Sequence, residues 1–350
     1  MKTQRWVLWF EELGQGDVKR GGAKCANLGE LDRIGMPVPP GFVVTTEAYD
    51  SFLKQTNGGT EINECLNMLA RKPKGITEYE ELSQRLWQII IEKEIPNEIQ
   101  HSISQAYAAL GRKCEVLDVP VAVRSSGVAE DLPTAAFAGQ YESFLGVKGK
   151  RNLLNKVKEC WASLFTARAI SYRMQNKLPI LAGLMGVIVQ RTINARSAGV
   201  AFTMLPSTGD ASWIMIEANW GTAESVVQGI VAPDRYYINK ETLEIEEKNV
   251  AKKLKQISLT KAGTMEEKIP LHKQSAPCVL DEELAKIAEM ARQVEQHYGS
   301  PQDIEWVIEQ DMPFPKNIFL VQTRPLSAVQ KKSPVDKAAD LICSRFLGLK

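Results

Sequence analysis

Two segments near the end of the chain alternate charged or polar side chains with apolar ones. Residues 303–309 read DIEWVIE and residues 318–324 read IFLVQTR, with the intervening sequence QDMPFPKN containing two prolines. This pattern predicts two strands joined as a hairpin, each with one apolar face. If Glu309 pairs with Ile318, Glu305 lies opposite Gln322 and Asp303 lies opposite Arg324. A slip of one residue would bury the charges, which favours this register.

The polar face of this hairpin has a composition that suits magnesium and phosphate. A carboxylate and an amide oxygen side by side are hard ligands of the kind that Mg²⁺ prefers, and an arginine suits the phosphates that such a metal carries. On the other face, the same register would place Trp306 opposite Val321. The pattern alone also fits an ordinary polar pair on a protein surface.

A second candidate segment, residues 120–147, reads PVAVRSSGVAEDLPTAAFAGQYESFLGV. Its first residues predict a buried strand that ends in Arg124 and the small residues SSG. An arginine supplies planar donors and a small-residue loop supplies backbone amides, so the segment suits a phosphate chain. A buried ion pair of Arg124 with Glu130 or Asp131 is the alternative.

A third candidate is Lys24 in the sequence GGAK, which precedes a helix predicted over residues 26–34. Glycines before a helix start can present free N–H groups, beside the ammonium group, to a phosphate. The GxxxxGK[ST] spacing of a Walker loop is missing. From spacing alone, a loop lysine in solvent is the favoured interpretation.

These segments occur in one order, together with VIVQRTINARSAGVAFT and WGTAESVVQGIVAPDRYYI. In that order they resemble the ATP-binding domain of phosphoenolpyruvate synthase, pyruvate phosphate dikinase and rifampicin phosphotransferase, over roughly residues 21–325. The resemblance implies an ATP-grasp fold of the α+β class, with two lobes that clamp ATP. We expect the first lobe at residues 1–196, the second at 197–328 and a C-terminal tail at 329–350.

The resemblance also implies roles for individual residues. Gln190, at the end of the apolar strand MGVIVQ, is expected beside the adenine, and Glu305 and Gln322 are expected to bind Mg²⁺. Gly139 and Ser143 are expected in a small loop that closes over the phosphates. The residues expected to act on the phosphates are Lys24, Arg124, Arg324 and, beside Arg324, Asp303. Residues 23 and 25 (Ala and Cys) stand where the family has glycines, which leaves the conformation of the lysine loop open.

The family's phosphate-accepting histidine lies in a GG-x-x-S/T-H context on a mobile domain. This chain has His101, His272 and His297, none in that context, and each is expected on the surface. We therefore expect the ATP-binding subunit of a split phosphotransferase that releases AMP and phosphate, with the histidine on a partner subunit. The small subunit of phenylphosphate synthase is such a split member, which makes phenol, bound on the partner, the expected acceptor.

Other functions remain open from the sequence. The chain could be the ATP-binding part of a phosphoenolpyruvate synthase-like or rifampicin phosphotransferase-like enzyme. An ATP-grasp ligase would release ADP instead of AMP, and a nucleotide-sensing regulatory subunit would bind ATP without turnover.

Composition narrows the class of protein. The 350 residues are 44% hydrophobic and 24% charged, with a net charge of +1, which gives no electrostatic case for nucleic acid or a membrane surface. The longest early apolar run, residues 6–10, is too short for a signal peptide or a membrane span. The six cysteines form no CxxC pair and predict reduced thiols in a cytoplasmic protein.

The remaining elements follow from periodicity and caps. Helices are expected around residues 80–93, 97–110 and 153–165, and another from a cap at Asp281 to a stop at Gly299. Thr45 or Thr46 is expected to cap a helix. Strands are expected at residues 185–190, 199–203, 213–217 and 236–238. The charged stretch 240–275, with lysines at 252, 253 and 255, is expected to be solvated.

Overall fold

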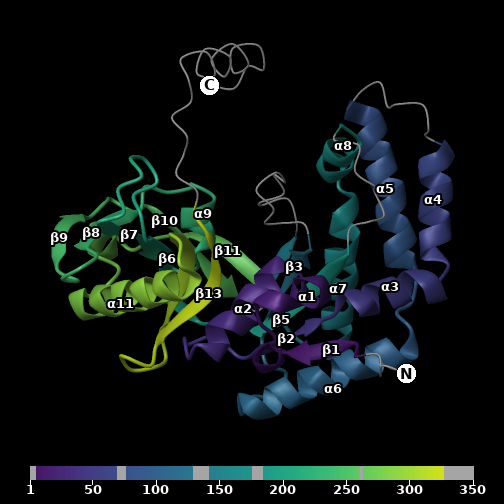
Figure 1. Cartoon of the computed structure of the whole chain (residues 1–350), viewed down its shortest axis with the longest axis horizontal. Helices are drawn as coiled ribbons and strands as arrows, with labels where there is room; N and C mark the ends of the chain where they lie inside the picture. Colours follow the sequence, from purple (N-terminus) through teal and green to yellow (C-terminus); the bar gives the residue numbers. More distant parts are fainter. Residues whose placement is uncertain (1–4, 69–75, 129–141, 176–183, 261–262, 327–350) are drawn as a thin grey trace.

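The computed structural model describes residues 5–68, 76–128, 142–175, 184–260 and 263–326, which form two lobes side by side (Figure 1). The first lobe contains a five-stranded sheet in the order β1-β2-β5-β3-β4. The second contains a six-stranded sheet in the order β13-β12-β6-β7-β8-β9, and a separate hairpin of β10 and β11. The α+β class expected from the sequence is confirmed.

The first sheet is antiparallel throughout and separates two sets of helices. Its strands are β1 (Val7–Trp9), β2 (Gly41–Val44), β3 (Val121–Gly127), β4 (Ser143–Val147) and β5 (Met185–Arg191). Along β3 and β5, Val123 and Val189 belong to the large core under the helices, whereas Ile188 packs in a smaller cluster on the opposite face. The period of two along each strand therefore turns Ala122, Arg124 and Gln190 away from the large core.

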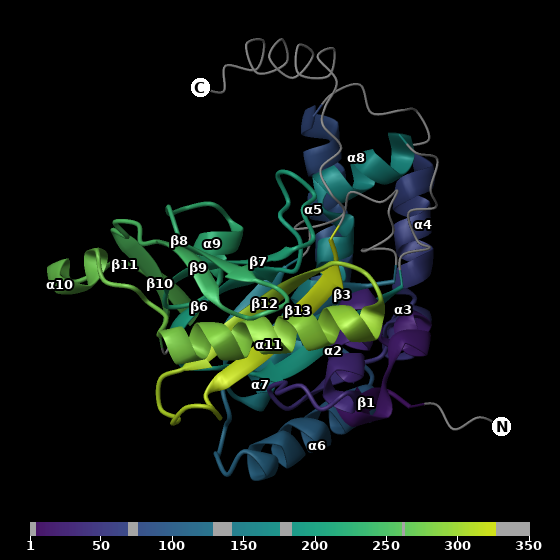
Figure 2. The same cartoon turned by 60° about the vertical axis from the view of Figure 1, so that its left-hand side comes forward.

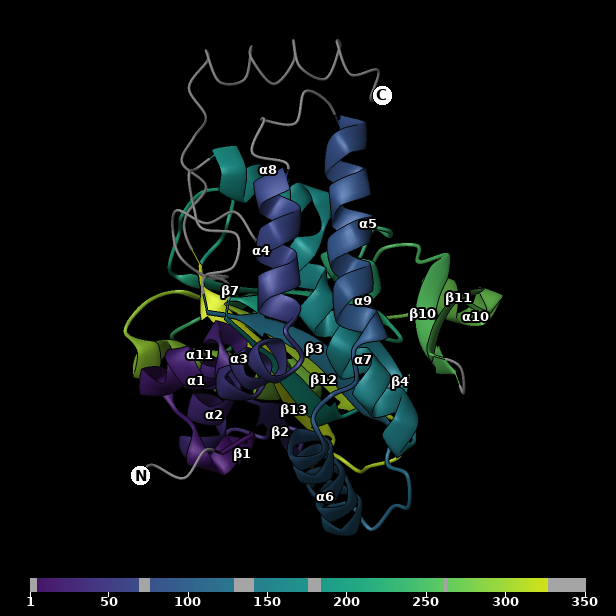
Figure 3. The same cartoon turned by 90° about the vertical axis from the view of Figure 1, so that its right-hand side faces the viewer.

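Most helices of the first lobe pack against the sheet around the large core. Helices α4 and α5 lie side by side, next to α8 (Figures 1 and 3). Phe52 stacks on Trp161 with ring centroids 4.9 Å apart, which joins α3 to α7. Thr45 caps α3 by accepting a hydrogen bond from the Ala48 N–H. The helical segments are η1 (Phe10–Glu12), η2 (Gln15–Asp17), α1 (Val18–Gly21), α2 (Ala23–Arg33), α3 (Thr46–Gln55), α4 (Gly58–Met68), α5 (Ile76–Glu92), α6 (Asn97–Lys113), α7 (Lys150–Ala162), η3 (Ser163–Phe165) and α8 (Ala167–Gln175).

The second lobe packs one long helix, α11, across its sheet (Figure 2). Leu284 and Ile287 of this helix join Trp306 in a core on one sheet face, which leaves the other face toward the first lobe. Its strands are β6 (Ala195–Phe202), β7 (Trp213–Trp220), β8 (Asp234–Asn239), β9 (Ile245–Asn249), β10 (Lys255–Thr260), β11 (Gly263–Lys268), β12 (Gln302–Glu309) and β13 (Ile318–Pro325). Its helices are α9 (Glu224–Val227), α10 (Leu271–Gln274) and α11 (Asp281–Tyr298).

Helix α11 begins differently from the sequence expectation. Asp281 is its first helical residue and Leu280 is the N-cap residue. The Leu280 N–H is bound by the Glu283 carboxylate at 2.9 Å, so the glutamate three residues on replaces the expected cap. Asp281 instead pairs with Lys248. The helix ends at Gly299 in the left-handed conformation, as expected.

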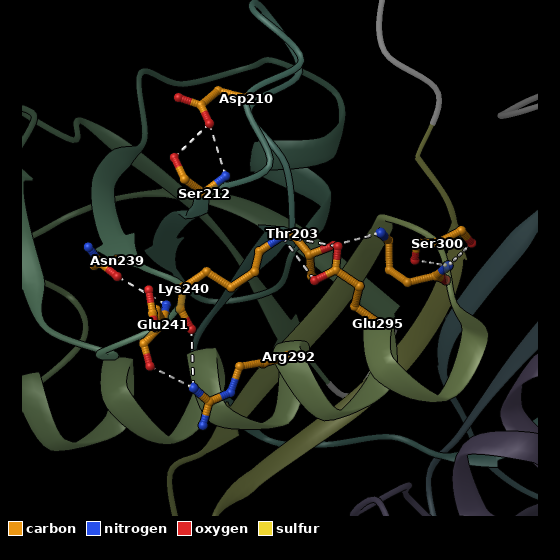
Figure 4. A network of polar contacts seen from close by, with 10 residues as sticks. Thr203, Asp210, Ser212, Asn239, Lys240, Glu241, Arg292, Glu295 and Ser300 are labelled. Carbon is orange, nitrogen blue, oxygen red and sulfur yellow. Dashed lines mark hydrogen bonds and ion pairs between the residues drawn. The ribbon is translucent and has the colours of Figure 1, made fainter.

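Polar contacts fix the C-terminal half of α11 to the turn between β8 and β9 (Figure 4). Arg292 donates to the carbonyl oxygens of Lys240 and Glu241 at 3.1 and 3.0 Å. The Lys240 ammonium in turn pairs with Glu295 at 2.9 Å. These contacts bind the polar side of α11 to the turn, while its apolar side packs in the core of the second lobe.

The charged stretch 240–275 contains one buried lysine, contrary to expectation. Lys253 and Asp234 form an ion pair in which neither side chain is exposed. Asp234 also accepts from the backbone N–H groups of Ala251 and Cys278, at 2.9 and 3.1 Å. A buried charge requires this degree of compensation. Lys252 and Lys255 are exposed, as expected.

Helix α2 lies between the lobes (Figure 1). Its Leu28 packs in a first-lobe cluster and its Leu31 in the core of the second lobe. The Asn27 amide donates to the Thr323 carbonyl at 3.0 Å. One short helix thereby contacts both lobes.

Two further expectations concern cysteines and membranes. Five of the six cysteines lie in the described part of the chain, and these five are free thiols. Across the described ranges, no helix has both the length and the apolar character needed to span a membrane.

The buried ion pair of the second lobe gives a stability prediction. Lys253→Ala should lower the free energy of unfolding by about 3–5 kcal/mol, because Asp234 would stay buried without its cation. Lys255→Ala is the matched control: Lys255 forms an exposed pair with Glu266, worth about 0–1 kcal/mol. Urea unfolding of the three proteins measures both values. Equal small effects would contradict the burial of Lys253.

Candidate functional site

A cavity of about 430 Å³ lies between the two lobes. The first lobe contributes α2, β3, β4 and β5, and the second contributes β12, β13 and the segment around α9. Seven of the residues singled out from the sequence line it together: Lys24, Arg124, Ser143, Gln190, Glu305, Gln322 and Arg324. Residues spread over most of the chain therefore meet at one place.

The hairpin of β12 and β13 has the expected pairing at its polar end. Asp303 lies opposite Arg324 and Glu305 opposite Gln322. The pairing of Trp306 with Val321 is wrong, because a β-bulge after Glu305 places Trp306 opposite Leu320.

The bulge has a consequence for the cavity. Its extra residue, Val321, lines the cavity beside Gln322, while Leu320 and Ile318 remain in the core. The same shift places Ile318 opposite Ile308 instead of the expected Glu309. A bulge can direct side chains in this way because two residues on one strand oppose one on the other.

Arg124 reaches from the first lobe onto this hairpin. Its Nη2 lies 3.0 Å from Oε1 of Gln322 and 3.4 Å from Oε2 of Glu305, and its Nη1 donates to the Val321 carbonyl at 3.2 Å. The Arg124 and Glu305 side chains are only 15% and 16% exposed. The alternative partners considered from the sequence, Glu130 and Asp131, lie outside the described residues.

Arg324 is bound to its cross-strand neighbour. Its Nε and Nη2 lie 2.8 and 2.7 Å from Oδ2 of Asp303. Burial raises the pKa of Asp303, and the Arg324 guanidinium opposes that shift. Asp303 is not one of the described residues that line the cavity. Its contact is with Arg324, which it orients toward the cavity.

The backbone before Lys24 accommodates Ala23 and Cys25 at the two positions where the family has glycines. Only Gly22 has a positive φ there, +82°, and a Cβ on it would lie 2.0 Å from the Ser126 carbonyl oxygen. Ala23 and Cys25 are helical residues of α2, where side chains fit, and the Cys25 N–H donates to Ser126 Oγ at 3.1 Å. The departures from the family's glycines thus leave the close approach of α2 to β3 intact. Lys24 lies in the first turn of this helix.

Of the three remaining predicted residues, Gln190 and Ser143 are described by the structure. Gln190 is buried, and its Nε2 donates to the Pro39 carbonyl at 3.1 Å. Ser143 begins β4 directly opposite Arg124. Gly139 lies outside the described residues.

Thr222 and Glu224 are among the polar residues of the second lobe that line the cavity without having been singled out individually. Burial raises the pKa of Glu224, against the influence of Arg124 and of a hydrogen bond with the Thr264 side chain. Thr222 Oγ1 is buried and has no hydrogen-bond partner among the residues that the structure describes. In the sequence, only the resemblance of the WGTAESVVQG segment to the family pointed to Thr222 and Glu224. Neither residue belongs to an alternating pattern that would assign its side chain to a face.

The oxygen ligands that Glu305 and Gln322 offer fit a magnesium ion, although these residues do not belong to a larger cluster of charged ligands. Within the ranges that the structure covers, no three His, Cys, Asp or Glu residues gather as a metal site. The Glu305 carboxylate and the Gln322 amide oxygen lie on facing residues and already share one cation, the Arg124 guanidinium. Two hard oxygens that jointly bind a cation suit Mg²⁺.

The three histidines, all described, lie outside the cavity lining. His101 and His272 are exposed, as expected. His297 is exposed as well, as expected, and its Nε2 lies 2.8 Å from Oε1 of the buried Glu30. It joins α11 to α2.

Comparison with known proteins assigns this chain to a family. The family model described as "Pyruvate phosphate dikinase, AMP/ATP-binding domain" matches residues 18–341. A probable phosphoenolpyruvate synthase of Staphylothermus marinus is 38% identical, over 97% of this chain and 44% of the relative. One of Methanothermobacter thermautotrophicus is 41% identical, over 94% and 47%. The phosphoenolpyruvate synthase of Pyrococcus furiosus is 36% identical, over 96% and 45%. This chain spans less than half the length of these relatives.

Two solved structures are distantly similar. Biotin carboxylase of Campylobacter jejuni has a TM-score of 0.28 and 10% identity, over 67% of this chain and 36% of that one. An L-amino acid ligase of Bacillus licheniformis has a TM-score of 0.23 and 11% identity, over 68% and 44%. At these TM-scores the likeness carries no argument.

The glycine before Lys24 gives a matched pair of substitutions. Gly22 and Gly149 share a φ of +82°, but a Cβ on Gly149 would meet nothing within 4 Å. Both alanine variants should lose about 1–3 kcal/mol from the strained backbone. Gly22→Ala should lose about 1–3 kcal/mol more from the clash with Ser126. Thermal unfolding tests this, and equal losses would show that α2 does not depend on its close approach to β3.

Proposed function

Because the chain belongs to the family of pyruvate phosphate dikinase AMP/ATP-binding domains, we propose that it binds Mg–ATP in the cavity between its lobes. Water is then consumed as the β-phosphoryl group of ATP passes to a histidine outside these 350 residues, on another domain or subunit, and AMP and the γ-phosphate, as inorganic phosphate, are released. The fold is the expected ATP-grasp fold, given the family and the two facing α+β lobes. The convergence of Lys24, Arg124 and Arg324 on the Glu305–Gln322 pair carries the proposal.

Each group has a role that follows from its charge. Lys24, Arg124 and Arg324 would bind the phosphates and compensate negative charge as the phosphoryl group moves. Asp303 would orient Arg324. Glu305 and Gln322 would hold Mg²⁺, which when bound neutralises phosphate charge. Phosphoryl transfer depends chiefly on positioning and electrostatic stabilisation, so a site without its own nucleophile suffices.

The nucleoside would lie toward the end of the cavity lined by Gln190. Here β5 of the first sheet leads into β6 of the second sheet through residues 192–194. We place the lobes at residues 1–196 and 197–328 on this basis. The tail, residues 329–350, lies outside the described residues. Gly139 and Ser143 would belong to the loop over the phosphates.

The acceptor is a separate part of the proposal. The relatives' names favour a phosphoenolpyruvate synthase-like enzyme, with pyruvate as the acceptor, over a phenylphosphate synthase acting on phenol. Either enzyme would form AMP and phosphate. None of the three histidines lines the cavity, which supports a phosphate-accepting histidine supplied from elsewhere. We further propose that the enzyme works in the cytoplasm.

One experiment tests this function. The chain is incubated with Mg²⁺ and ATP labelled on the β-phosphate, with or without the histidine-carrying domain of the Pyrococcus furiosus relative. We expect AMP, phosphate and an acid-labile label on the added domain. Pyruvate or phenol is then supplied in separate arms to an enzyme that also contains the relative's remaining domains. ADP as the product, or stable label on His297 of the chain alone, would contradict the proposal.

Variants of the hairpin test the placement of the chemistry. Glu305→Gln and Arg324→Gln should each slow label transfer by at least about 100-fold, as expected for the loss of one preorganised charge. Unfolding midpoints check that the fold survives. Arg235→Gln, which breaks an exposed pair with Glu217, is the control and should transfer at the wild-type rate. Wild-type rates in either hairpin variant at saturating Mg–ATP would refute the assignment.

Lys24→Ala tests the loop that departs from the family pattern. Loss of a charged hydrogen bond to phosphate should weaken ATP binding by about 10–100-fold. Lys19→Ala removes an exposed lysine from the neighbouring helix α1 and should leave the affinity unchanged. Isothermal titration with ATP measures both. Unchanged binding in Lys24→Ala would show that this side chain does not reach the phosphates.

A further inference from the structure

The guanidinium group of Arg124 occupies the place between two oxygens that the proposed function assigns to magnesium. Its Nη2 contacts Oε1 of Gln322 at 3.0 Å and Oε2 of Glu305 at 3.4 Å. Its Nη1 is held by the Val321 carbonyl at 3.2 Å. The carboxylate and amide are therefore bridged by a cation that belongs to the opposite lobe.

We propose that Arg124 is a placeholder cation, which holds Glu305 and Gln322 until Mg²⁺ and ATP arrive together. The cavity then accepts the Mg–ATP complex and binds free divalent cations weakly. This inference rests on the proposed function, since it assumes that the same residues later bind metal and phosphate.

The charges around the cavity explain why a free divalent cation would not enter easily. Glu305 is paired with Arg124 and Asp303 with Arg324. A free divalent cation would have to displace the guanidinium and would then lie beside it. Arg124 and Glu305 are 15% and 16% exposed, so water screens that repulsion less than at a protein surface.

When Mg²⁺ and ATP enter the cavity together, the repulsion between the metal and the Arg124 guanidinium is compensated. Arginine keeps its charge at all ordinary pH values, so Arg124 can leave the two oxygens only by moving. The phosphates of ATP give it an anionic partner in the same cavity, while Glu305 and Gln322 take the metal. All the charged groups then stay compensated.

The displacement would also alter the contact between lobes. Arg124 lies on β3 and its partners lie on β12 and β13, so its contacts cross the cavity. Arg191 and Glu309 join the lobes independently, through two hydrogen bonds of 3.0 and 2.9 Å. The lobes thus remain connected through Arg191 and Glu309 while the contacts of Arg124 are exchanged.

Mn²⁺ binding measured by electron paramagnetic resonance tests the proposal without turnover. The wild-type chain should bind Mn²⁺ at least tenfold more weakly alone than with β,γ-imido-ATP. Arg124→Gln should raise the nucleotide-free Mn²⁺ affinity at least tenfold. The double variant Arg124→Gln with Glu305→Gln should lose that gain, because the carboxylate ligand is gone. Arg235→Gln, which breaks an exposed arginine–glutamate pair, is the matched control and should behave as wild type.

The outcomes separate this inference from the proposed function. If the wild-type chain binds no β,γ-imido-ATP, the proposed function fails. If it binds the nucleotide but Arg124→Gln shows no gain in Mn²⁺ affinity, only the placeholder role is overturned. Should Arg124→Gln not fold, Arg124→Lys takes its place. A lysine keeps the charge but cannot make the same forked contacts, so its Mn²⁺ affinity should rise above wild type, and an unchanged affinity would overturn the role.

Discussion

The antiparallel register of β12 and β13 is the constraint on which the candidate site depends. Ile304, Trp306 and Ile308 are buried against α11, so the alternation along β12 turns Asp303 and Glu305 to the opposite face. Reversing the faces would place both carboxylates in the apolar core against α11 and remove Trp306 from that core. Burial on one side of the sheet thereby determines the chemistry on the other.

The cavity itself depends on how the lobes meet. The first sheet presents Ala122, Arg124 and Gln190 toward the second lobe because their neighbours along β3 and β5 fill the large core. Helix α2 packs its apolar residues into both lobes, which holds the start of the helix, with Lys24, at the cavity. The position of each cation thus follows from apolar packing elsewhere.

The sequence alone predicted those features that depend on local periodicity. The strand faces, the pairing of Glu305 with Gln322 and the stop at Gly299 all follow from alternation or turn chemistry within a few residues. The bulge at Val321 was missed because uniform pairing is the simplest reading of two alternating segments. The cap of α11 was misplaced because Glu283 binds the Leu280 N–H, which makes Leu280 the N-cap residue in place of Asp281.

Contacts between distant segments were beyond the sequence. Lys253 is buried because it pairs with Asp234, a carboxylate that two backbone N–H groups also bind, and nothing near the lysine in the sequence indicates this. Arg124 meets Gln322 almost two hundred residues away, a contact that no local pattern around the arginine indicates. The roles of the cavity residues in binding and catalysis remain predictions, since they depend on ligands.

The central claim is that the cavity between the lobes holds ATP with its phosphates at the hairpin. A crystal structure of the chain with Mg²⁺ and β,γ-imido-ATP tests this most directly. We expect the base beside Gln190, the phosphates between Arg124 and Arg324, and the metal on Glu305 and Gln322. A nucleotide bound outside this cavity, or bound in it with its phosphates away from both arginines, would contradict the account.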